Sequence, residues 1–382
     1  MKRLTLKTAP LLALLLMLLT PAALADDGEG CVTVTVDGVA LFTLAGEVSE
    51  GDEYISADNT LYRIESVSGG AATAVRIGQE DMPDVSWLDA GDAQAVFAAS
   101  VPAASSGTDS ASGGGQKLIA MYVTHSDESY IPSDGTQSIE GQGGIYDVAR
   151  QFRDALQAQG IDVILDESTH LPHDSGAYRR SRQTAERLLE NRPDAIIDIH
   201  RDGIPDQSEY TLTVNGENAS RVRLLVGRSN QNSAVNREFA KQLKVVADKK
   251  YPGLVKDIFI GKGNYNQDLS PNAILLEFGT HTISKERVLE STDLMANVVS
   301  TALYGEQTGS AQSRESAAKA EKAKNKSASG SVVWMIVIVI VAVLIFACVQ
   351  TGGGKGMKTK LGRGVSEITG GLMGKKPEEG ER

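Results

Sequence analysis

The chain has 382 residues, of which 41% are hydrophobic, and a formal net charge of −11 at pH 7. This acidic balance, without a basic stripe or an aromatic platform, excludes a general nucleic-acid binder. The two cysteines, Cys31 and Cys348, lie near opposite ends of the sequence, so no disulfide framework supports the fold.

Two apolar segments predict how the chain meets the membrane. Residues 1–25 combine a basic start, an apolar run and small residues before Asp26, which is typical of a cleaved secretory signal peptide. An uncleaved anchor is the weaker alternative, because the apolar run is short for a bilayer span. Residues 331–349 are long and apolar enough for a transmembrane helix, and the basic tail 350–382 suits the cytoplasmic side. We expect a single-pass protein of the cell membrane with an extracytoplasmic body.

The body divides by composition. Residues 26–98 alternate β-branched and polar side chains between Gly-rich turns, which predicts a small β-rich module. The sequence of this module does not indicate its function. A Gly/Ser/Ala linker at residues 99–116 separates this module from a larger domain at residues 117–305. Residues 306–330 are again polar and predict a stalk before the membrane.

Strand and helix patterns alternate in the larger domain. Apolar runs predict strands at 117–124, 162–165, 195–199, 210–214, 222–226 and 273–276. Helical spacing or composition predicts helices at 144–159, 177–190, 234–250 and 285–304. This order implies an α/β fold with a mostly parallel sheet and helices on both faces. The carboxyl ends of such strands share one edge, where ligand and metal sites are built.

Three predicted strands end in residues that can bind a metal or move a proton, namely His125, His200 and Glu277. Glu140 precedes the first helix of the domain and can turn back toward the same edge. Two imidazoles, one carboxylate and an open position form the usual ligand set of catalytic zinc, with Glu277 as the general base. Glu128 is a rival for the carboxylate ligand. Asp198, two residues before His200, shares its side of the strand and can orient a ligand.

Six segments resemble the stage II sporulation protein P family of cell-wall amidases. They are THSDESY at 124–130, HD at 173–174 followed by Tyr178 and Ser181, DIHRD at 198–202, YPG at 251–253, YNQDL at 265–269 and LLEFG at 275–279. The resemblance covers residues 118–303, about half of the chain. It implies the fold of zinc-dependent N-acetylmuramoyl-L-alanine amidases, in agreement with the strand–helix alternation.

The resemblance also implies roles. His125, Glu140 and His200 would bind Zn²⁺, and Glu277 would be catalytic. Arg201 and Asn266 are candidates for substrate binding, as is His173 from its loop, while a structural role for Arg201 beside Asp198 or Asp202 is the alternative. The substrate implied is the peptidoglycan amide between muramic acid and L-alanine, and some family members also cut the peptide cross-link.

The biological setting expected from the resemblance is wall remodelling during engulfment in sporulation, beside other engulfment proteins such as a lytic transglycosylase. Vegetative wall turnover is the alternative, because the family is usually anchored at its N-terminus rather than by a C-terminal span. Two other functions stay open. One is a catalytically inactive wall-binding or scaffolding protein, and the other is a different zinc hydrolase acting on the cell wall.

Overall fold

The computed structural model describes residues 30–90 and 117–305 of the chain. The expected signal peptide, linker, stalk, membrane span and basic tail lie outside these residues. Within them, no helix combines the length and the apolar character that crossing a bilayer requires.

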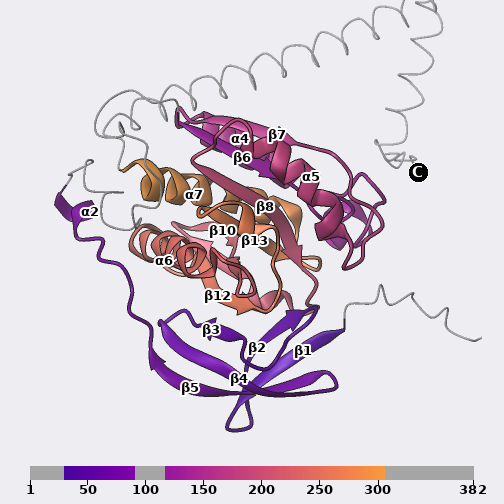
Figure 1. Cartoon of the computed structure of the whole chain (residues 1–382), viewed down its shortest axis with the longest axis vertical. Coiled ribbons are helices and arrows are strands. Elements are labelled where there is room, and N and C mark those ends of the chain that lie inside the picture. Colours follow the sequence, from indigo (N-terminus) through magenta and orange to yellow (C-terminus); the bar gives the residue numbers. More distant parts are fainter. Residues whose placement is uncertain (1–29, 91–116, 306–382) are drawn as a thin grey trace, which may run out of the picture. The chain divides into compact units, whose positions relative to one another are not determined.

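The larger domain alternates strands and helices in the predicted order (Figure 1). Its sheet strands are β6 (Leu118–Tyr122), β7 (Asp162–Asp166), β8 (Ala195–Asp202), β11 (Val222–Gly227), β12 (Val255–Gly261) and β13 (Ala273–Thr280). The predicted helices form as α4 (Ile145–Gln157), α5 (Ala177–Leu189), α6 (Ser233–Lys250) and α7 (Lys285–Tyr304). Shorter elements are α3 (Ile131–Asp134), η2 (Gln207–Glu209) and η3 (Gln267–Leu269).

Two details differ from the sequence prediction. The strand expected at 210–214 is β9 (Thr211–Val214), which pairs only with β10 (Glu217–Ser220) in a separate two-stranded sheet. Strand β12 was not predicted, because Lys256 and Asp257 interrupt its apolar pattern. Both side chains are nevertheless buried in the fold, where Lys256 pairs with Glu209 and Asp257 with Arg223.

The strands of the larger domain run in the spatial order β12-β11-β13-β8-β6-β7. Each neighbouring pair is parallel except β11–β13, which is antiparallel. The carboxyl ends of β6, β8 and β13 therefore lie at one edge of the sheet. This arrangement confirms a mixed α/β fold with a mostly parallel sheet.

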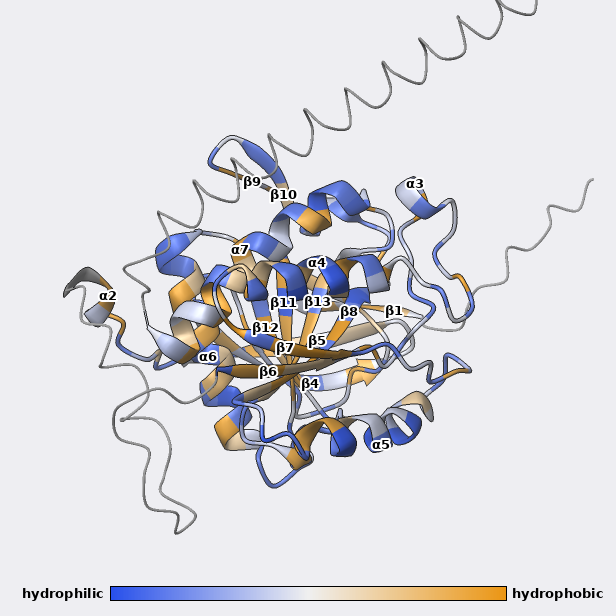
Figure 2. Ribbon diagram, turned by 90° about the horizontal axis from the view of Figure 1, so that it is seen from above, coloured by the Kyte–Doolittle hydropathy of each residue, from blue (hydrophilic) through white to orange (hydrophobic). Residues whose placement is uncertain are grey.

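Helices cover both faces of this sheet, as predicted (Figure 2). On one face, α4, α6 and α7 bury alternate strand residues such as Ile119, Met121 and Ile197 in the largest hydrophobic cluster. On the other face, α5 packs its Ala185 and Leu188 against a second cluster that includes Tyr122. Alternate residues of one strand serve opposite faces because strand side chains have a period of two.

Residues 31–79 fold into five strands, which we call the β module. They are β1 (Cys31–Val36), β2 (Val39–Ala45), β3 (Glu53–Ile55), β4 (Thr60–Ser68) and β5 (Ala71–Gln79), with α2 (Trp87–Ala90) following. Strand β3 pairs antiparallel with β12, so the β module extends the sheet of the larger domain to 11 strands. Phe42, Leu44 and Tyr54 of the module share a hydrophobic cluster with Leu225 and Phe259. The β module thus covers sheet strands on the face that α5 also occupies.

Candidate active site

The strand ends bring together three of the predicted residues. His125 follows β6, while His200 and Glu277 lie near the ends of β8 and β13 and are Cα partners in the parallel ladder. The ladder becomes irregular directly after Glu277, where Gly279 adopts φ +72°. Such irregularities are common beside active sites, because they redirect side chains and end the pairing.

The centre of the cluster is the carboxylate of Glu128. Its Oε1 atom lies 3.3 Å from Nδ1 of His125 and 3.4 Å from Nδ1 of His200. Its Oε2 atom accepts the backbone N–H of Arg201 at 2.9 Å. Burial alone would raise the pKa of Glu128, but His200, His125 and Arg201 hold this pKa well below its usual value. Glu128 is therefore a buried carboxylate that stays ionised between two imidazoles.

The two histidines have distal nitrogens without a hydrogen bond. Nε2 of His125 is buried and unpartnered among the described residues. Nε2 of His200 lies 3.1 Å from Oδ1 of Asp198 but outside hydrogen-bonding geometry. Burial lowers the pKa of His125. Burial would also lower the pKa of His200, but the carboxylates of Asp198 and Glu128 raise it well above the usual value.

Asp198 is held rigidly behind His200. Its two carboxylate oxygens accept hydrogen bonds from the backbone N–H of Thr124 at 2.9 Å and from the Thr124 hydroxyl at 2.6 Å. The Thr124 hydroxyl also contacts the hydroxyl of Ser181. A carboxylate fixed in this way can orient the imidazole of His200. Carboxylates that contact a metal-binding histidine usually have this role.

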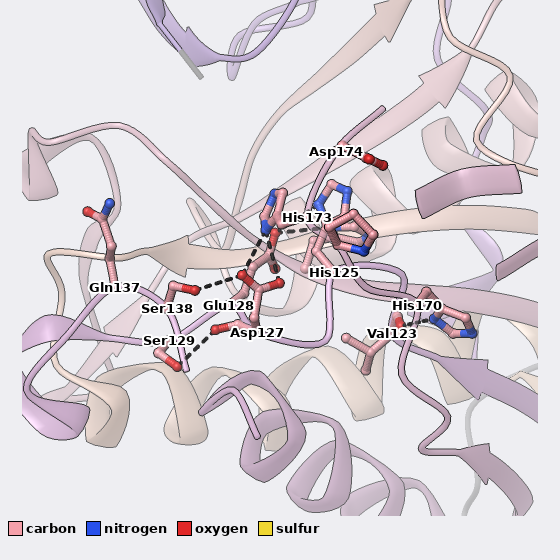
Figure 3. Close-up of polar contacts among 12 residues, drawn as sticks. Val123, His125, Asp127, Glu128, Ser129, Gln137, Ser138, His170, His173 and Asp174 are labelled. Carbon is pink, nitrogen blue, oxygen red and sulfur yellow. Dashed lines mark hydrogen bonds and ion pairs between the residues drawn. The ribbon is translucent and has the colours of Figure 1, made fainter. Parts of the chain in front are cut away.

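His173 joins the cluster from the loop before α5. Its ring stacks on that of His125 with the centroids 3.9 Å apart, and its Nδ1 lies 3.0 Å from Oδ1 of Asp127. Asp127 is fixed in turn by the Ser138 hydroxyl at 2.7 Å, as Figure 3 shows. His125, Glu128 and His173 offer ligand atoms that all lie within 4.8 Å of one another, so this group could hold a metal ion.

His200 also contacts the Glu128 carboxylate, so His125, Glu128 and His200 are a second candidate set that shares two residues with this group. Tetrahedral zinc with ligands at 2.0–2.1 Å places ligand atoms roughly 3.3 Å apart. The distances from Glu128 to His125 and His200 match this spacing. Nδ1 of His173 already faces the carboxylate of Asp127. The spacing of Glu128 from His125 and His200 is thus compatible with zinc ligation, while the group whose ligand atoms all lie within 4.8 Å of one another contains His173 in place of His200.

Glu277 has the environment of a general base. Its Oε2 atom lies 3.2 Å from the hydroxyl of Tyr210 and 3.7 Å from Nη1 of Arg223. Burial and the carboxylate of Asp202 raise the pKa of Glu277 to about 8, against the opposing effect of Arg223 and His200. A carboxyl group with a pKa near neutrality can both take up and release a proton during a reaction.

Comparison with known proteins places this site in a family. The family model of stage II sporulation protein P (SpoIIP) matches residues 79–300. The chain belongs to the stage II sporulation protein P family. The stage II sporulation protein P of Bacillus subtilis (strain 168) is 29% identical over 221 residues, which are 53% of this chain and 55% of that relative. The chain thus spans about half the length of this curated relative.

Solved structures show only weak similarity. The N-acetylmuramoyl-L-alanine amidase AmiC2 of Nostoc punctiforme is 15% identical with a TM-score of 0.34, over 50% of this chain and 97% of that one. The amidase Ami1 of Mycobacterium smegmatis is 17% identical with a TM-score of 0.32, over 50% and 99% of the two chains.

The family resemblance named Glu140 as a metal ligand, but the structure does not bring it to the histidines. Glu140 is exposed in the turn that the hydrogen bond from Gln142 N–H to the Ile139 carbonyl closes. The backbone N–H of Ile139 bonds to the carbonyl of Asp127, so this segment runs alongside the Asp127–Glu128 backbone. Glu128, the rival ligand from the sequence, takes the place between the imidazoles.

Two residues expected to bind substrate make hydrogen bonds that support loops. The guanidinium of Arg201 donates to the backbone carbonyls of Ser129 at 3.2 Å and Gln137 at 2.9 Å, which fixes the loop that carries Glu128. The amide of Asn266 donates to the Tyr178 carbonyl and the Ser181 hydroxyl, both at 3.0 Å. These contacts agree with the structural alternative for Arg201, although its partners are backbone carbonyls.

Sequence reasoning missed Arg223, Asp202 and Tyr210, the groups around Glu277. One signal was available for Arg223, since it is the one charged residue in the apolar strand Val222–Gly227. An arginine inside a buried strand needs acidic partners, because an unpaired buried charge is very costly. The identity of those partners depends on strand order, which the sequence does not state.

Proposed function

We propose that this protein is a zinc-dependent peptidoglycan hydrolase that cleaves the amide between N-acetylmuramic acid and L-alanine. The observation that carries the proposal is the buried carboxylate of Glu128 between His125 and His200, with Glu277 paired to His200 on the neighbouring strand. Membership in the stage II sporulation protein P family supports the substrate class and a role in sporulation.

The side chains present fit a metal ion. Their donors are two imidazoles and one carboxylate, and Nδ1 of each imidazole lies within 3.4 Å of Oε1 of Glu128. We assign the metal to His125, Glu128 and His200. Bound zinc would supply a Lewis acid that makes a water acidic and polarises the amide carbonyl.

Residues of the protein then transfer the proton. Glu277 accepts a proton from the attacking water and delivers it to the leaving nitrogen as the C–N bond breaks. The products are a free lactyl carboxyl group on the sugar and a stem peptide with a free alanine amine. Asp198 lies 3.1 Å from His200, and Arg201 holds the loop of Glu128, so both residues support the reacting groups during the transfer.

The cellular setting is part of the proposal. We place the catalytic region outside the cytoplasm, behind a signal peptide at residues 1–25 and tethered by a membrane span at residues 331–349. Peptidoglycan near the membrane is then within reach, and other engulfment proteins, such as a lytic transglycosylase, are the natural partners. Cutting of the peptide cross-link is a further activity to be tested with the same substrate.

The experiment uses the full-length chain with purified peptidoglycan, with and without a chelator, and identifies the products by mass. Intact stem peptides with a free alanine amine, lost on chelation and restored by zinc, support the proposal. Truncated peptides would instead assign the cut to a peptide bond. Bound zinc without any released product would favour the wall-binding alternative, and full activity in the chelator would exclude a metal-dependent reaction.

A further inference from the structure

Arg223 is the largest fully buried side chain of the described residues, and its partners surround Glu277. Its Nε atom donates to Oδ1 of Asp257 at 2.8 Å, and Nη1 donates to Oδ2 of Asp202 at 2.9 Å. Nη1 also lies 3.7 Å from Oε2 of Glu277. A buried cation held by several carboxylates in fixed geometry is a rigid support for each of them.

Tyr210 connects the same groups. Its hydroxyl lies 2.8 Å from Oδ2 of Asp202 and 3.2 Å from Oε2 of Glu277, and its side chain is fully buried. The position of the Glu277 carboxylate is thus set by Tyr210 and Arg223, and Asp202 holds both of these groups.

The β module contacts Arg223 and Asp202 from outside the larger domain. The backbone carbonyl of Thr43 accepts a hydrogen bond from Nη2 of Arg223 at 3.1 Å. The backbone N–H of Ala45 lies 3.4 Å from Oδ1 of Asp202. The ring of Phe42 lies beneath the guanidinium, 5.6 Å from its central carbon. Strand β2 therefore contacts Arg223, which lies beside Glu277, and Asp202, which holds Arg223 and Tyr210.

Ion pairs fix the β module in this position. Arg237 of α6 donates to the carboxylates of Glu53 and Glu80, and Arg228 donates to the buried Asp52. Together with the β3–β12 ladder, they attach the β3 side of the module to the larger domain. The family match begins at residue 79, so the strands of the β module lie almost entirely outside it.

We propose that the β module is a positioning element of the catalytic centre, which holds the Glu277 carboxylate through Arg223 and Asp202. This inference rests on the proposed function, in which Glu277 moves the proton. A module that only binds cell wall would have no need of backbone contacts with two buried charged residues behind the site. Displacing β2 should therefore slow the chemical step without weakening the binding of substrate.

A substitution at Gly203 can displace β2 by a small distance. A methyl group at Gly203 would lie 2.7 Å from the Cβ of Ala45, closer than two carbon atoms can approach. The variant Gly203→Ala therefore pushes β2 away from Asp202, and Ala45→Gly in the same chain removes the clash. Gly78→Ala is the matched control, since it adds a methyl group to β5 with nothing within 4 Å.

The test measures kcat and KM on a soluble muramoyl-peptide, together with bound zinc, for the full-length variants. We expect Gly203→Ala to lower kcat by about 10-fold to 100-fold with KM and zinc unchanged, because small misplacements of a reacting group are costly. The double variant Gly203→Ala/Ala45→Gly should recover most of this loss. Gly78→Ala should match the wild type.

A wild-type kcat in Gly203→Ala would overturn the inference while leaving the proposed function intact. Absence of rescue in the double variant would also overturn it, as would a rise in KM alone, which points to wall binding by the module. If Gly203→Ala does not fold, Arg223→Lys replaces it, since this variant keeps the charge and loses the forked contacts. Arg223→Lys with wild-type kcat would again refute the inference, and a wild-type chain without amidase activity would refute both proposals.

Discussion

Glu277 and His200 are Cα partners on the neighbouring parallel strands β13 and β8. Paired residues of neighbouring strands direct their side chains to the same face of the sheet. This relationship puts the proposed base beside a proposed metal ligand without any contribution from a flexible loop.

Replacing Glu277 by Gln should abolish proton transfer while keeping the size of the side chain. We expect the rate of stem-peptide release to fall by roughly 10²–10⁴, because that is the usual contribution of a general base. Zinc content should equal that of the wild type, since Glu277 is not assigned as a ligand. Digestion of peptidoglycan at the wild-type rate would show that another group takes the proton.

The variants Glu128→Ala and Glu140→Ala separate the two candidate carboxylate ligands. Glu128 contacts both histidines, whereas Glu140 is exposed. We therefore expect Glu128→Ala to lose metal affinity and activity, and Glu140→Ala to keep both. Zinc content per chain, measured after dialysis, checks this directly. The reverse pattern would return the ligand role to Glu140.

His200→Ala and His173→Ala compare the two imidazoles that lie beside His125. Removal of a ligand from a three-ligand site should release the zinc, so we expect His200→Ala to bind little metal. His173→Ala should retain it, because the His173 imidazole is held by Asp127. Metal titration of the two purified variants provides the measurement. Zinc retained in His200→Ala and lost in His173→Ala would favour the alternative ligand set.

Arg237→Ala should make the free energy of unfolding less dependent on pH in the acidic range. Burial alone would raise the pKa of Glu53, but Arg63 and Arg237 hold this pKa below its usual value. A carboxyl group with a lowered pKa in the folded state stabilises the fold above its unfolded pKa, and this contribution disappears as the pH falls through the folded pKa. We expect Arg237→Ala to lower the free energy of unfolding by about 1 kcal/mol at pH 7, with a smaller difference below roughly pH 4.

Denaturant unfolding at pH 7 and at acidic pH measures this difference. Arg76→Ala serves as the control, because Arg76 is an exposed arginine of β5. An equal loss of stability at both pH values would mean that Arg237 acts through packing rather than through its ion pairs.

Much of the fold could be predicted because local patterns determine it. Apolar runs and helical spacing marked nearly all sheet strands and the long helices of the larger domain. Strand β12 was not predicted, because its charged Lys256 and Asp257 have partners only in the folded protein. The alternation of strands and helices then required a mostly parallel sheet, and a shared edge for His125, His200 and Glu277.

The sequence by itself thus determined which residues stand at the strand ends that meet at one edge, because the strands and the residues that end them are local features. Only the tertiary structure placed Glu128 rather than Glu140 between the imidazoles, since a loop's path depends on hydrogen bonds to distant backbone. Tertiary structure also decided that the β module supports Glu277 through Arg223 and Asp202. These contacts join segments more than 150 residues apart, and no local pattern encodes which buried charges will meet.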